Sequence, residues 1–210
     1  MNDRRSLGSA AYRRLSNIAR SSASRLRIAH LERQYPRVRI DRSSYVGPGC
    51  HIAASDQSEI QIENSYIAAG VVIRASGGGR IHLRSSYIGY NSVIAGHAQI
   101  EIDEGCLIAE MVVVRDSDHV VEDALGLAQA GHRADAVHIG RNVWIGAKAT
   151  ILRGVSIGDG AVVAASAVVR TDIEGGSLFA GIPARFIKRV RASDRGDACA
   201  ELRGRVDPLG

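Results

Sequence analysis

Aliphatic residues recur at every sixth position over residues 139–169. These positions are Ile139, Ile145, Ile151, Ile157, Val163 and Val169. Smaller or branched residues follow four positions later, at Val143, Ala149, Val155, Ala161 and Ala167. Neither an α-helix nor simple strand alternation has a period of six. A large aliphatic residue, then a small one, then a turn predicts one flat side of a parallel β-helix, with the aliphatic residues inside a narrow prism.

The preceding part of the chain repeats more loosely. The segments YVGPGCHI (45–52), YIAAGVVI (66–73) and YIGYNSVI (87–94) begin 21 residues apart, and LIAEMVVV (107–114) follows after 20. Three hexads need only about 18 residues, so each coil has room for one extra bend, at segments such as AASDQSE and RASGGGR. Equivalent residues of successive coils should then stack. We expect an inner ladder of Ile67, Ile88 and Ile108, and an outer ladder of Tyr45, Tyr66 and Tyr87.

The flanks of the repeat differ from it. Residues 1–37 lack β-branched runs and predict a helical arm that ends at Pro36. The β-helix is expected over 38–190, interrupted by a polar loop at 115–137. Residues 191–210 have almost no apolar content and are expected to form a short disordered tail. The predicted fold class is therefore all-β, a parallel β-helix with an N-terminal helical arm and a C-terminal tail.

Composition narrows the class of protein. Aromatic residues make up only 4% of the chain and glycine occurs 23 times, as expected for a thin-walled β structure rather than a helical bundle. The net charge of +5 is uneven, because residues 1–39 carry ten arginines against Asp3 and Glu32. A basic arm of this kind can contact an anionic membrane surface or present a solvated helix face. We expect no nucleic-acid partner.

Three cysteines, Cys50, Cys106 and Cys199, form no CxxC pattern, so neither a disulfide framework nor a metal site is expected. No apolar run approaches the ~20 residues that span a bilayer. The first residues, MNDRRSLGSAAYRR, lack the apolar stretch of a secretory signal. We therefore expect a soluble cytoplasmic protein.

The segment IGRNVWIGAKATILRGVSIGDGAVVAASAVV, followed by AGIPARFIKRV, resembles the hexapeptide-repeat acyltransferases. The upstream DSDH sequence at 116–119 adds to the resemblance, which is greatest to the sugar and polysaccharide O-acetyltransferases. The resemblance implies a left-handed β-helix, a homotrimer with active sites between subunits, and acetyl-CoA as cosubstrate. The acceptor would be a small molecule or a glycan with a free hydroxyl.

The resemblance also assigns roles. His119 occupies the position of the catalytic base, and histidine suits that role because its ordinary pKa lies near neutrality. Asp116 or Asp118 is expected to orient it, as a carboxylate does in a triad. The residues expected to contact acetyl-CoA are Trp144, Gly146, Ala164, Arg170, Arg185 and Lys188.

The register of the repeat gives His119 a position of its own. Ile108 and Val114 mark inward positions, and a continued repeat places Val120 inward and His119 one residue before it. Trp144 has the same phase, so both residues should face outward near a corner. Within the loop, His132 and Arg133 are candidates for binding the acceptor or its phosphate, although His132 is also consistent with a surface histidine.

Other functions remain open on this fold. An N-acetyltransferase of an amino sugar would use the same scaffold. A zinc carbonic anhydrase would need three converging histidines, and a non-catalytic scaffold would leave the DSDH sequence unexplained. Acceptor identity, the size of the acyl group and the orienting acid are not determined by the sequence.

Overall fold

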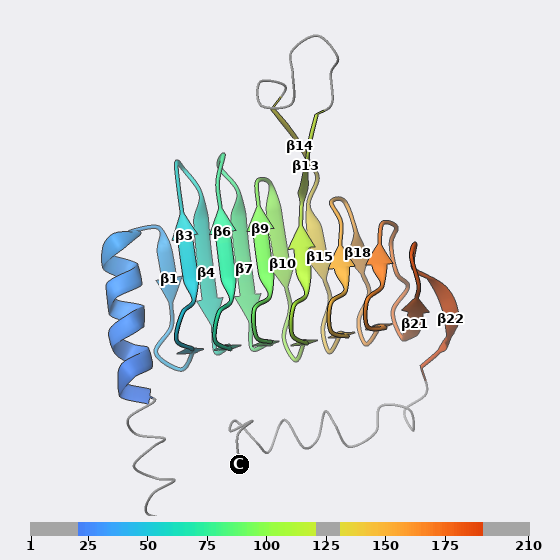
Figure 1. The fold of residues 1–210 in the computed structure, drawn as a ribbon, viewed down its shortest axis with the longest axis horizontal. Helices are drawn as coiled ribbons and strands as arrows, with labels where there is room; N and C mark the ends of the chain where they lie inside the picture. The colour runs from blue at the N-terminus through green and yellow to red at the C-terminus, as the bar shows by residue number, and fades with distance from the viewer. Residues whose placement is uncertain (1–20, 121–130, 191–210) are drawn as a thin grey trace, which may run out of the picture.

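The computed structural model describes residues 21–120 and 131–190, which form six coils of a parallel β-helix after one helix (Figure 1). The first three coils contain β1 (Val38–Ile40), β2 (Tyr45–Val46), β3 (His51–Ala54), β4 (Glu59–Glu63), β5 (Tyr66–Ile67), β6 (Val72–Ala75), β7 (Arg80–Arg84), β8 (Tyr87–Ile88) and β9 (Val93–Gly96). The last three contain β10 (Gln99–Ile102), β11 (Leu107–Ile108), β12 (Val113–Arg115), β15 (Val137–Ile139), β16 (Trp144–Ile145), β17 (Thr150–Ile151), β18 (Ser156–Ile157), β19 (Val162–Val163) and β20 (Val168–Val169).

Each coil gives one strand to each of three parallel sheets, which form the sides of the prism. Sheet A runs β1-β4-β7-β10-β15-β18. Sheet B begins β2-β5-β8-β11-β16-β19, and sheet C runs β3-β6-β9-β12-β17-β20. This arrangement confirms the predicted all-β fold class and is consistent with a left-handed β-helix. The predicted extra bends lie at 55–58 and 76–79, where the chain passes from sheet C to sheet A.

Ladders of aliphatic side chains fill the prism. Ile67, Ile88 and Ile108 are in register on β5, β8 and β11 and are completely buried, as predicted. All eleven positions of the C-terminal hexads are at most 1% exposed. Each fully buried aliphatic side chain contributes about 1.5–3 kcal/mol. The apolar ladders therefore account for the stability of a domain with few aromatic residues.

The outer face of sheet B carries a second, outward-facing apolar column. The rings of Tyr45, Tyr66 and Tyr87 stack with centroids 4.6 and 5.4 Å apart, which confirms the predicted outer ladder. The register continues this column through Leu107 and Trp144. Trp144 is 50% exposed.

A helix at residues 21–34 covers the first coil (Figure 1). Ser24 accepts a 2.8 Å hydrogen bond from the backbone N–H of Val46, and Arg27 donates to the Val46 carbonyl at 2.9 Å. Glu32 accepts from the N–H of Ile40. The helix thus satisfies edge-strand groups of both β1 and β2 and protects that end of the β-helix from pairing with another chain.

At the other end, β21 (Ser177–Ala180) extends sheet B, and β22 (Arg185–Arg189) pairs with it in the antiparallel direction. Within residues 21–120 and 131–190 no helix is long and apolar enough to cross a membrane. The expected C-terminal tail lies outside the described residues.

Candidate active site

A two-stranded hairpin interrupts the β-helix between the fourth and fifth coils. It consists of β13 (Ser117–His119) and β14 (His132–Ala134), which pair in the antiparallel direction. Figure 1 shows it rising above the body of the β-helix, where the chain passes from sheet C to sheet A. The strands on either side of it pair as if nothing intervened, because β12 pairs with β17 and β10 with β15. The predicted polar interruption is thus a hairpin at its base, and residues 121–130 lie outside the described part of the chain.

The hairpin carries His119 and His132 opposite each other, in direct register. Their ring centroids are 4.4 Å apart at an interplanar angle of 47°. Both residues are exposed, and none of the described residues hydrogen-bonds the imidazole of His119. An exposed imidazole with free ring nitrogens can accept a proton from a bound hydroxyl.

A third histidine, His97, lies on the far side of His132, with ring centroids 4.5 Å apart. Its two ring nitrogens lie 2.9 Å from the hydroxyl of Ser117 and 3.1 Å from that of Ser76. Burial lowers the pKa of His97, and the charge of the neighbouring His132 lowers it further. His97 is therefore held in place and favoured as a neutral ring.

The ring of His132 contacts both other rings, and the three histidines are called the histidine row below. No group of three or more histidines, cysteines or acids within residues 21–120 and 131–190 is arranged to hold a metal ion. Tetrahedral zinc needs ligand atoms that converge within about 2.0–2.3 Å of one centre. The described residues of one subunit therefore form no zinc site by themselves.

Asp116 is completely buried at the point where the hairpin leaves the coil. Its carboxylate accepts hydrogen bonds from the backbone N–H groups of His97 at 2.7 Å and Ala98 at 2.8 Å. Both oxygens are thus bonded to the corner of the previous coil. Asp116 positions the backbone of His97, and no contact joins it to the ring of His119.

Asp118 also has a partner away from His119. Its carboxylate accepts a 2.8 Å hydrogen bond from Nε of Arg153, which lies at the same corner one coil later. Arg153 also pairs with Asp135 on the other side of the hairpin base. The hydrogen bond that Arg153 donates to Asp118 and the charge of Asp135 raise the pKa of Arg153. One guanidinium therefore clamps both sides of the hairpin to the β-helix.

The expected register of the loop is wrong in one respect. A continued repeat would turn Val120 into the prism, but the last inward residue of that coil is Val114 and Val120 is partly exposed. Where the chain leaves the prism, the side chain of Asp116 bonds to the preceding corner and its carbonyl accepts a hydrogen bond from the N–H of Asp135 on the returning side of the hairpin. His119 and Trp144 consequently do not share a face.

The residues expected to contact acetyl-CoA fall on two sides of the molecule. Trp144 lies on β16 of sheet B, with Gly146 and Ala164 at the corners that follow β16 and β19. Lys188 lies beside Leu178, in the strand pair that closes the same sheet. Arg185 is exposed at the start of β22, opposite Ala180. These five residues are on or next to sheet B, which is the side of the prism opposite the hairpin.

Arg170 and Arg133 lie at the other corner. Arg170 follows β20 and is exposed where sheet C passes to sheet A, two coils beyond the hairpin. Arg133 is exposed on β14, opposite Asp118. The structure thus places Arg170 with the histidines rather than with Trp144.

Gly146 has a structural reason to be glycine. A Cβ atom built on it would lie 2.5 Å from the backbone nitrogen of Ala165 in the next coil. Gly47 and Gly89 occupy the same corner in earlier coils, with equally close backbone contacts. The small side chain allows the coils to stack closely, whether or not a ligand lies against this corner.

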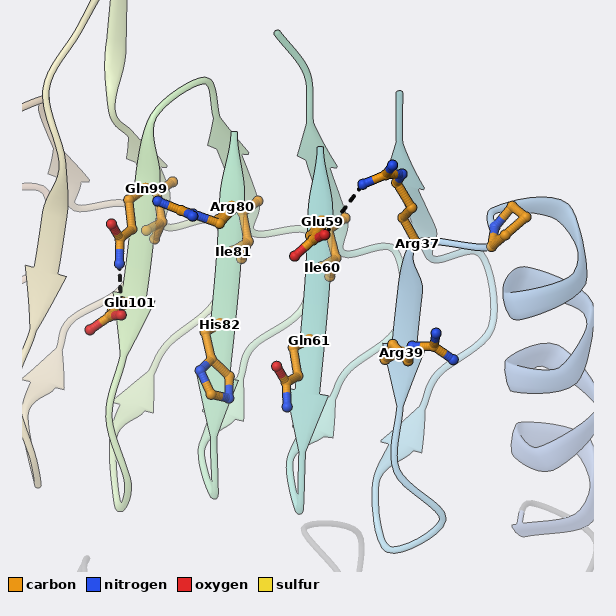
Figure 2. A pocket seen from close by; sticks show the side chains of 12 residues that line it. Arg37, Arg39, Glu59, Ile60, Gln61, Arg80, Ile81, His82, Gln99 and Glu101 are labelled. Atoms are coloured by element: carbon orange, nitrogen blue, oxygen red, sulfur yellow. Dashed lines mark hydrogen bonds and ion pairs between the residues drawn. The ribbon is translucent and has the colours of Figure 1, made fainter. Parts of the chain in front are cut away.

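A groove of about 650 Å³ crosses the outer face of sheet A (Figure 2). Arg37 pairs with Glu59 at one end, and Gln99 donates to Glu101 at the other. Gln99 follows the His97 corner by two residues. The remaining lining is formed by Pro36, Arg39, Ile60, Gln61, Arg80, Ile81, His82 and Ile100. The groove offers hydrogen-bonding groups to a polar ligand, but His97, His119 and His132 do not line it.

Three contributors to the site were missed from the sequence. His97 and Ser76 lie in coils before the interruption, and Arg153 lies in the coil after it. Stacking equivalent corners of successive coils would have placed all three beside the hairpin. The signal that was missed is therefore the column of corners rather than any local motif.

Residues 136–171 match the family described as bacterial transferase hexapeptide (six repeats). The chain is 36% identical over 104 residues to the probable acetyltransferase Rv3034c of Mycobacterium tuberculosis, a match covering 49% of this chain and 35% of that protein. It is 32% identical over 106 residues to the galactoside O-acetyltransferase of Escherichia coli K12, covering 50% and 52%. These matches confirm the resemblance to the hexapeptide-repeat acyltransferases, although they span about half or less of the curated relatives.

Among solved structures, a variant of AntD from Bacillus cereus has a TM-score of 0.56 and 20% identity, with 77% of this chain and 92% of that one covered. AntD is an N-acyltransferase, and that crystal contains dTDP and coenzyme A. At this identity the similarity extends to the fold alone.

Proposed function

We propose that this protein is an acetyl-CoA-dependent O-acetyltransferase, acting on a hydroxyl of a sugar, glycan precursor or polysaccharide. The observation that carries the proposal is the exposed imidazole of His119, which makes no hydrogen bond to any of the described residues and is presented by a hairpin beside a hexapeptide β-helix. The acetyltransferase names of the relatives support the donor, and the galactoside O-acetyltransferase supports the acceptor class.

In the proposed reaction His119 takes the proton of the acceptor hydroxyl while the hydroxyl oxygen attacks the thioester carbonyl of acetyl-CoA. The tetrahedral intermediate then collapses to the acetyl ester, and the departing thiolate takes the proton from His119. No covalent enzyme intermediate is required. Ser117, the neighbouring hydroxyl, is only 6% exposed, so a thioester carbonyl has little access to it.

We also propose that the site forms between two subunits of a homotrimer. His119 projects from the corner between sheets C and A, whereas Trp144 and its neighbours lie on sheet B. Within one subunit these two groups are on opposite sides of the prism. A cyclic arrangement places the hairpin of one subunit against the sheet B side of the next, and the exposed apolar column through Trp144 suits such a contact.

The test is acetyl transfer from labelled acetyl-CoA to a panel of sugars and amino sugars. Replacing His119 with Ala should lower kcat by about 10²- to 10⁴-fold while coenzyme A binding, measured by calorimetry, persists. His51→Ala, an exposed histidine on β3, is the matched control and should retain activity. Undiminished turnover of His119→Ala would refute the role of the base. Absence of coenzyme A binding to the unaltered protein would instead favour a non-catalytic scaffold, and an alkali-stable amide product would indicate N-acetylation.

A further inference from the structure

Neither acid of the DSDH sequence contacts the ring of His119 among the described residues. Asp116 is bonded to the backbone of His97 and Ala98, and Asp118 to Arg153. A general base needs a fixed ring, because a displacement of about 1 Å can lower the rate 10²-fold. The described residues in contact with the ring of His119 include one aromatic neighbour, His132.

The ring of His132 also packs against that of His97. Its ring lies between those of His119 and His97, at centroid distances of 4.4 and 4.5 Å and with similar tilts of 47° and 43°. These distances are at the close end of the range for interacting aromatic rings. His132 therefore transmits the position of His97 to His119 by packing.

His97 is the fixed end of the row. Its ring is bonded on both nitrogens by Ser76 and Ser117, and its backbone N–H is bonded to the buried carboxylate of Asp116. Side-chain and backbone anchors together leave little rotamer freedom. The fixed end also belongs to the β-helix, whereas His119 and His132 belong to the hairpin.

We propose that His132 and His97 are positioning residues for His119, with His97 fixed to the β-helix and His132 transferring its position by ring packing. This inference rests on the proposed function, since it takes His119 as the base. It assigns to an aromatic side chain the orienting role that a carboxylate has in a triad. It also replaces acceptor binding as the primary role of His132.

Kinetics of three variants test the inference. His132→Ala removes the packing and should lower kcat by about 10- to 100-fold with the KM for acetyl-CoA unchanged. His132→Phe keeps a ring of similar size and should restore kcat to within about threefold of the original. His97→Ala should also lower kcat, and its effect should largely disappear in the His132→Ala background, because both act through one contact chain.

Two kinetic results would overturn the inference. One is a His132→Ala variant with unaltered kcat, which would show that the ring does not position the base. The other is a His132→Phe variant as slow as His132→Ala, which would show that a ring nitrogen and not packing is required. If His132→Ala acted only by disturbing the fold, it would change the KM for acetyl-CoA as well as kcat. A loss confined to kcat that His132→Phe reverses therefore indicates positioning.

Imidazole NMR tests the row independently of turnover. Loss of the His132 ring should shift the ring-proton resonances of both His119 and His97, whereas His51→Ala should shift neither. Unchanged resonances in His132→Ala would refute the packing. If the unaltered protein transfers no acetyl group, the proposed function fails, yet this measurement still decides whether the row exists.

Discussion

The carboxylate of Asp116 accepts a 2.7 Å hydrogen bond from the backbone N–H of His97, which lies one coil earlier. The bond joins the residue at which the chain leaves the β-helix to the corner that anchors the histidine row. Asp116 belongs to the DSDH sequence, where a catalytic acid was expected, but its contacts are structural.

Asp116→Ala should destabilise the protein by about 2–4 kcal/mol, because it removes two bonds to a buried carboxylate and leaves two backbone N–H groups without partners. Asp118→Ala is the matched control and should change stability little, since the side chain of Asp118 is 53% exposed. Urea unfolding of both variants provides the measurement. Equal losses from the two would contradict the difference in burial.

Stability should fall as the pH drops below the ordinary histidine pKa near 6.5. The folded pKa of His97 is lowered, so the contribution of the neutral ring is complete above about pH 6.5 and is lost as the pH falls through the folded value. His132, His119 and Arg115 oppose protonation, and Asp116 favours it. His97→Gln, which cannot titrate, should flatten this part of the curve when urea unfolding is compared between pH 7.5 and pH 5.5. A variant curve as steep as the original would assign the effect to other groups.

Gly146→Ala should destabilise the β-helix by about 1–3 kcal/mol, because the new methyl group meets the backbone of the next coil. Ala165→Ser, at an exposed neighbouring position, should have almost no effect. Thermal unfolding measured by circular dichroism distinguishes the two. If Gly146→Ala unfolds like the original but binds acetyl-CoA poorly, ligand contact and not coil stacking explains the glycine.

Ser166→Gly should stabilise the protein by about 1 kcal/mol. Ser166 has a φ of 59°, in the left-handed region that non-glycine residues adopt at a cost. Ser156→Gly, in the regular strand β18, should instead lower stability. The comparison of their unfolding free energies checks the assignment, and stabilisation by both substitutions would contradict it.

Mixing subunits of two impaired variants tests the proposed composite site. His119→Ala and Trp144→Ala should each reduce transfer at acetyl-CoA concentrations below KM. In the proposed homotrimer, joint refolding of the two variants should give about one quarter of the original activity, because that share of subunit boundaries pairs an intact His119 with an intact Trp144. Activity that stays at the level of the separate variants would place both residues in one subunit.

The sequence predicted the β-helix well because its signal is repeated. Each hexad from Ile139 to Val169 repeats the same inward position, so local errors do not accumulate, and the tyrosine ladder follows from the same spacing. The interruption carries no repeat, and its register failed at Val120. There the buried bonds of Asp116 determine the path of the chain, and such bonds depend on which corners meet in space.

The candidate site was predicted only in part for the same physical reason. His119 was identified from a short motif, but His97, Ser76 and Arg153 reach it from other coils. The acids of the motif were expected to act on the histidine next to them in sequence. Their actual partners lie 18 to 35 residues away along the chain, at stacked corners.

The uninterrupted pairing of β12 with β17 has a consequence for how such proteins diversify. Because β12 pairs in register with β17 across the hairpin, the pairing of the β-helix strands does not depend on the length or sequence of the segment inserted at that corner. The entropic cost of a longer loop grows only slowly with its length. Segments of different length and sequence can therefore be inserted at this corner without changing the β-helix, with the buried Asp116 carboxylate joining the base of the insertion to the previous coil.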